Sequence, residues 1–152
     1  MSYLVLRADY PDEFNPDRFY TKAMGEQIRQ QYHQRLNSAG VVYGECRSST
    51  EGTLETSLSR VSHTVEDLFW QGPELHATIR VLRTQSGNEL KTLLDEGWVH
   101  FSVRGLGSIK ANGEVVIDRL FAIDALPGAR DPFFVQKLRR AKLERILHGS
   151  SA

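Results

Sequence analysis

The stretch WVHFSVRGLGSIK, residues 98–110, combines a half-buried strand with an abrupt glycine-rich ending. Apolar residues occupy every second position from Val99 to Val103, which is the period of a strand with one face in the core. Arg-Gly-Leu-Gly, residues 104–107, then interrupts the pattern. Two interpretations compete. The glycines could form a β-bulge that bends the strand, or Ser102 could be a nucleophile followed by hydrogen-bond donors for an oxyanion.

A hairpin is predicted directly after this stretch. Asn112-Gly113, flanked by alternating apolar residues, is the strongest short hairpin signal in the chain. The strand over 98–110 should therefore pair with a strand over 114–125. A strict two-residue loop would place Ser102 opposite Ile123.

The remaining pattern predicts an α+β fold. It is a predominantly antiparallel sheet or barrel flanked by about three helices, and residues 1–152 form a single domain. Further strands are predicted over 3–7, 41–46, 58–70 and 75–83. Helices are predicted over 17–37, with Asn15-Pro16 at the start, over 86–97, with Ser86 as cap, and over 131–147.

Composition narrows the class of function. The chain has 19 Lys and Arg against 19 Asp and Glu, so its formal net charge is zero and no nucleic-acid partner is expected. No apolar run is long enough to span a bilayer. The single cysteine, Cys46, excludes an intrachain disulfide and cysteine-rich zinc sites. We expect no metal and no cofactor.

Ser102 is the candidate nucleophile, because Arg104 and the backbone around Gly105 could supply donors to a developing oxyanion. His63 is the candidate general base. It alternates with valines on its strand, so the alternative is a hydrogen-bonded core histidine. His100 shares a face with Ser102 about 7 Å along the strand, too far for a direct hydrogen bond.

A third member would orient the histidine, and Asp118 and Asp124 are the choices on the following strand. With the strict loop, both aspartates would lie on the face of Phe101, away from Ser102. A triad with either aspartate therefore needs a bulge in the Arg-Gly-Leu-Gly segment. Fallback carboxylates are Glu45, Glu66 and Asp67.

Three segments resemble the prohead (capsid maturation) serine proteases of tailed bacteriophages, which are similar in fold to the herpesvirus assemblin proteases. They are residues 61–97, with Ser-His on a strand, then FSVRGLGS, residues 101–108, and residues 115–133. The second is similar to the family's Ser-x-Arg-Gly-x-Gly, whose first serine is the nucleophile. Gly44-Glu45 is also present, but the following Cys46-Arg47 departs from the family's pattern.

The resemblance implies a serine endopeptidase with Ser102 as nucleophile, His63 as base and Asp124 as the likeliest third member; Arg104 and Gly105 would support the oxyanion. It would act in the host cytoplasm, inside the assembling prohead, on capsid and scaffold precursor proteins and on itself. The last predicted helix is a candidate interface for a homodimer. The alternative is a catalytically inactive phage assembly protein that retains the fold and binds capsid or scaffold partners.

Overall fold

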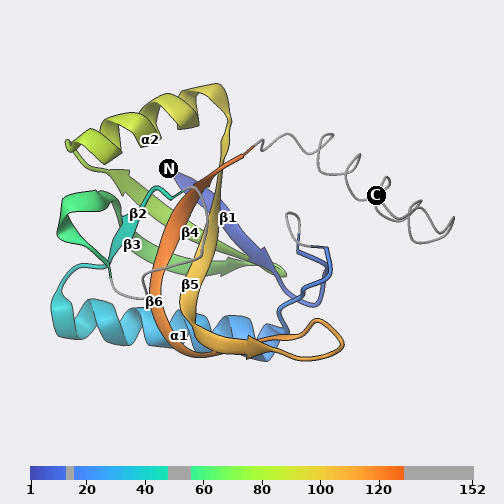
Figure 1. Ribbon diagram of the computed structural model, residues 1–152. Coiled ribbons are helices and arrows are strands. Elements are labelled where there is room, and N and C mark those ends of the chain that lie inside the picture. Colours follow the sequence, from blue (N-terminus) through green and yellow to red (C-terminus); the bar gives the residue numbers. More distant parts are fainter. Residues whose placement is uncertain (13–15, 48–55, 129–152) are drawn as a thin grey trace, which may run out of the picture.

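The computed structural model describes residues 1–12, 16–47 and 56–128. Its strands are β1 (Ser2–Arg7), β2 (Tyr43–Glu45), β3 (Val61–Gln71), β4 (Glu74–Val81), β5 (Val99–Ile109) and β6 (Val115–Pro127). Its helices are α1 (Lys22–Ala39) and α2 (Gln85–Glu96), and a short 3₁₀ turn, η1, covers Leu58–Arg60. Figure 1 shows α1 and α2 on opposite sides of the strands.

Two antiparallel sheets build the fold. The first has the strand order β1-β4-β3-β2, and the second is the β5–β6 hairpin. An isolated parallel bridge joins Cys46 to Ala125, and the Arg47 amide donates to the Ala125 carbonyl at 2.8 Å. The end of β2 therefore lies alongside β6, and the hairpin continues the first sheet around a curled half-barrel.

The hydrophobic core is shared by both sheets. It includes Leu68 from β3, Ala77 from β4 and Phe101 from β5, each at most 1% exposed. The rings of Tyr3 and Phe101 lie 5.0 Å apart, which brings β1 against β5 on the other side of the half-barrel. From Val99 to Val103, the alternation along β5 thus places the apolar residues in the core, as predicted.

Both helices have N-terminal caps other than the predicted ones, and α1 also begins later than predicted. α1 starts after Thr21, whose hydroxyl accepts from the Met24 amide at 3.1 Å, so the prediction that Asn15-Pro16 opens this helix is wrong. The reason is tertiary. The Phe19 backbone is extended and pairs with the start of β6, donating to the Gly113 carbonyl. In α2 the cap is Thr84 rather than Ser86.

The α+β class and the mostly antiparallel sheet are confirmed. The helix count needs correction, because the described residues contain two α-helices and not about three. The third predicted helix, over 131–147, lies outside the described residues. Within the described ranges, no helix combines the length and the apolar character that crossing a membrane requires.

Candidate active site

The register of the hairpin places Asp124 directly opposite Ser102. The loop is not the predicted two-residue turn. The amide of Lys110 donates to the Glu114 carbonyl, so three residues form the tip, and Gly113 takes a left-handed conformation with φ of 95°. Residues opposite each other in an antiparallel pair share a face. Asp124 therefore lies on the face of Ser102.

Two irregularities in the ladder produce this register. The pairing shifts between Arg104 and Gly105, and again between Leu106 and Gly107. A Cβ at Gly105 would meet the Arg119 carbonyl at 2.6 Å, and one at Gly107 would collide with the Val116 carbonyl. The glycines thus let the β6 backbone come close where the ladder shifts. The ladder is irregular at Arg-Gly-Leu-Gly, as predicted, but the residues without partners, Asp118 and Phe121, lie in β6 and not in that segment.

Arg104 is buried and paired with two buried carboxylates. Its Nε donates to Asp124 Oδ2 at 2.6 Å, and its Nη2 lies 3.2 Å from both Asp124 Oδ1 and Glu45 Oε2. Nη2 also donates to the Thr56 hydroxyl at 2.9 Å. Charge-assisted bonds of this kind are stronger than neutral ones, and stronger still away from water. These donors would have to leave their carboxylates before Arg104 could support an oxyanion directly.

Glu45 extends the network to the segment before β3. Its Oε1 accepts from Arg60 Nε at 2.9 Å, and its Oε2 accepts from the Ser57 amide at 3.2 Å. The Glu45 amide in turn donates to Asp124 Oδ1 at 3.1 Å. One buried carboxylate therefore joins β2, β5 and η1. The sequence offered Glu45 only as a fallback, because its partners are distant along the chain.

His63 lies in the core with both ring nitrogens engaged. Nε2 donates to the Ile123 carbonyl at 2.8 Å, and Nδ1 accepts from the Ser62 hydroxyl at 2.8 Å. Burial lowers the pKa of His63, against the opposing effects of the Ile123 hydrogen bond and the charge of Asp124. This is a neutral imidazole fixed in one tautomer.

The structure does not bring His63 and Ser102 together. The His63 ring packs edge-on against Phe101 at 5.5 Å between centroids. Neighbouring residues in a strand point to opposite faces, so Ser102 lies on the other side of β5 from this ring. Among the described residues, no hydrogen bond joins the Ser102 hydroxyl to a histidine. This geometry corresponds to the core-histidine alternative.

The two remaining candidates, Asp118 and His100, differ in exposure and in their position on the hairpin. Asp118 is exposed and sits at the second ladder shift, without a partner residue in the β5 register. His100 is half-buried, lies on the face of Ser102, and approaches Gly128. In the described ranges, no group of three or more His, Cys, Asp or Glu residues could hold a metal ion.

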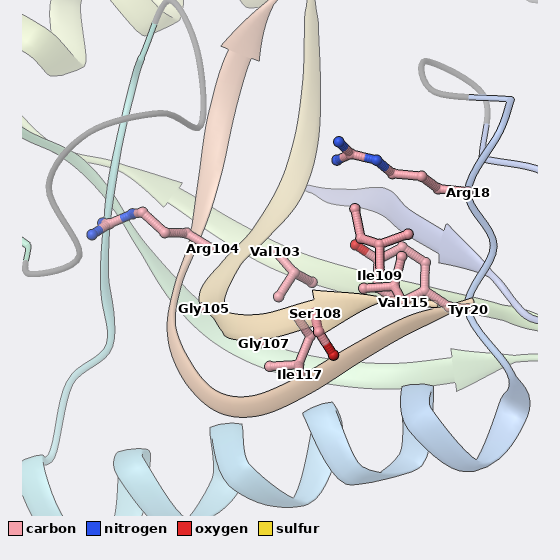
Figure 2. A pocket seen from close by; sticks show the side chains of 10 residues that line it. All are labelled: Arg18, Tyr20, Val103, Arg104, Gly105, Gly107, Ser108, Ile109, Val115 and Ile117. Carbon is pink, nitrogen blue, oxygen red and sulfur yellow. The ribbon is translucent and has the colours of Figure 1, made fainter. Parts of the chain in front are cut away.

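A pocket of about 200 Å³ lies beyond the bend of β5. Val103, Ile117 and Tyr20 form part of its wall, Ser108 lines it, and Arg18 reaches over it (Figure 2). The side chain of Arg104, by contrast, points away from the other lining side chains toward β2. β5 therefore carries an ionic network on one side and borders a pocket of mixed polar and apolar lining on another.

Comparison with known proteins connects this geometry to a family. Residues 12–127 match the family described as prohead core protein serine protease. The structure is similar to that of the bacteriophage T4 capsid assembly protease, gp21, with a TM-score of 0.67 and 21% identity over 84% of this chain and 81% of that one. No curated protein sequence matches. Since the family match spans most of the chain, this protein belongs to the prohead core serine proteases.

Proposed function

We propose that this serine protease is an endopeptidase of the assembling prohead, in which Ser102 attacks the peptide bonds of capsid and scaffold precursors and of the chain itself. The observation that supports this proposal most is the pairing register of β5 with β6. Ser102 is half-buried, opposite Asp124 and two residues before the Arg104 ion pairs. A nucleophilic serine needs activating groups close to it, and this register determines which side chains face Ser102. The assembling prohead inside the host cell is the proposed place of action.

The decisive experiment is mass spectrometry of capsid and scaffold precursors after co-expression with this protein. We expect defined cleavage products with the wild type and none with Ser102→Ala. Ser38→Ala is the control, since it removes an exposed serine from α1, outside the candidate site. A fluorophosphonate should label the wild type and Ser38→Ala at Ser102. Intact precursors with the wild type, together with an unlabelled Ser102, would refute the proposal.

Two histidines are tested as the general base. His63 can serve only if its ring leaves the Ile123 carbonyl and passes Phe101. His100 already lies on the face of Ser102. A general base contributes about 10²–10⁴-fold, so replacing the acting histidine by glutamine should lower the labelling rate by that factor. Replacing the other should leave the rate within a few-fold of wild type.

A second candidate is an assembly protein that keeps the protease fold and binds capsid or scaffold partners without hydrolysis. One observation favours it: His63 is held in the core by two hydrogen bonds, away from Ser102. In this case the Ser102→Ala protein would support the same assembly as the wild type. Precursor binding without cleavage, measured by co-purification, would identify this function.

The pocket beyond the bend is proposed to receive a side chain of the polypeptide substrate. Its lining combines apolar side chains such as Val103 and Ile117 with the charged Arg18, and it borders the strand that carries Ser102, which fits a peptide side chain. Ser108→Trp would fill the pocket from an exposed position, so we expect KM for precursor cleavage to rise about 10-fold, a loss typical of removed binding contacts. Fluorophosphonate labelling should not change. Ser38→Trp, on exposed α1 surface, is the control. A lower labelling rate with unchanged KM would contradict this assignment.

A further inference from the structure

The segment Thr56–Arg60 is fastened to the face of β5 that carries Ser102. Its three attachments are Thr56 to Arg104, the Ser57 amide to Glu45, and Arg60 to Glu45. Two of the three end on the same buried carboxylate. Ser102 is two residues from Arg104 on that face, about 7 Å along the strand. The segment is therefore bonded, through Arg104, to the strand that carries Ser102.

The charges of the buried side chains explain why Glu45 binds both Arg104 and the segment Thr56–Arg60. Glu45 and Asp124 are both fully buried, and Arg104 supplies only one positive charge between them. Two buried carboxylates need a further cation, since an uncompensated buried charge is costly. Arg60 provides it from η1, with its side chain 53% exposed. Arg47 approaches Asp124 at 3.9 Å. The ion pair between Arg60 and Glu45 thus holds η1 against the sheet.

We propose that Glu45 is a positioning residue of the protease: its carboxylate holds Arg104 and the segment Thr56–Arg60 in the geometry that Ser102 needs for attack. This rests on the proposed role of Ser102. The expected contribution is to the chemical step, because a displacement of about 1 Å at a reacting group can cost about 10²-fold in rate. Affinity for precursor should change little.

The test compares Glu45→Gln with Glu26→Gln. Glutamine keeps the shape of the side chain and removes its charge. Glu26 is a matched control, because it is also ion-paired and hydrogen-bonded, to Arg29 and Trp70, but on α1. We expect Glu45→Gln to lower kcat and the labelling rate of Ser102 by about 10- to 100-fold with KM nearly unchanged. Glu26→Gln should leave both at wild-type values.

Amide hydrogen exchange provides a readout that does not depend on activity. The Ser57 amide donates to Glu45, so its exchange should accelerate by about 10-fold or more in Glu45→Gln as the segment opens locally. Arg60→Gln removes a largely exposed side chain and covers the case in which Glu45→Gln fails to fold. It should show the same two effects more weakly, with an unchanged Tm.

Two results would overturn the positioning role. One is unchanged exchange at Ser57 in both variants. The other is faster exchange with a wild-type labelling rate, which would make Glu45 a purely structural residue. If the wild type itself is never labelled, the proposed function fails, and the exchange measurement alone decides whether Glu45 holds the segment.

Discussion

At the scale of single residues, burial decides what the polar side chains can do. Arg104 has the chemistry of an oxyanion donor, yet its Nε and Nη2 are directed at Asp124 and Glu45. His63 has the chemistry of a general base, yet it is enclosed by Ser62 and Ile123. The sequence pattern thus indicated that these polar side chains lie inside the protein. It could not indicate their partners, because the partners come from segments that are distant along the chain.

The enclosure of His63 predicts a pH dependence of stability. Burial lowers the pKa of His63 in the folded state, whereas the unfolded chain keeps the ordinary value of 6.5. Below that value the unfolded state binds more protons, so the stabilisation present at higher pH is lost as pH falls from 6.5 toward the lower folded pKa. The loss is at most about 1.4 kcal/mol per pH unit. His63→Gln should flatten this part of the profile in denaturant titrations between pH 7 and pH 5. Equal slopes in both proteins would contradict the prediction.

At the scale of elements, the β5–β6 hairpin shows what sequence reasoning could reach. The two strands followed from alternation. A break in register was expected for a two-residue loop, but the three-residue tip alone already places Asp124 on the face of Ser102, and the two shifts move it from opposite His100 to opposite Ser102. The position of the break could not be read, because the extra residues lie in β6, where Asp118 and Phe121 have no partners in the β5 register. The loop length was also misjudged, since Gly113 is held by the backbone of Phe19.

The close approach at Gly107 predicts a sensitive position. In Gly107→Ala the new methyl group would press on the Val116 carbonyl, so the ladder must open or lose its shift. We expect a loss of about 2 kcal/mol, as for other overpacked sites, and slower labelling of Ser102. Gly72→Ala is the comparison. Gly72 has φ of 60° with open space around it, so only about 1 kcal/mol of backbone strain applies and labelling should be unaffected. Denaturant titration measures both losses, and equal labelling rates in the two variants would disprove the coupling.

At the scale of the whole molecule, both sheets share one core. The cluster that includes Leu68 and Phe101 leaves neither sheet with an interior of its own. The α+β class could be predicted because each element's pattern indicates a single buried face. The closure of the half-barrel, in contrast, depends on the contact of β2 with β6, which is parallel and between segments far apart in sequence.

A shared core predicts a single unfolding transition, and two tryptophans can report it. Trp70 belongs to β3 in the four-stranded sheet, and Trp98 directly precedes β5 of the hairpin. The variants Trp98→Phe and Trp70→Phe leave one fluorophore in each region. Their fluorescence transitions should each coincide with the far-ultraviolet circular dichroism of the same variant, as for a two-state domain. A hairpin that melts at lower denaturant than the four-stranded sheet would show that the sheets are separate units.

The two ladder shifts also determine where the chain can change in length. Adding or removing one residue of β6 between Leu120 and Ala122 would move every later side chain of that strand to the opposite face. Asp124 and Ile123, both fully buried, would then exchange faces. A residue added between Ala111 and Asn112, which are exposed, leaves the strand pairing in place and avoids Gly113, which is held by the Phe19 backbone. A peptide graft into this hairpin therefore belongs between these two residues.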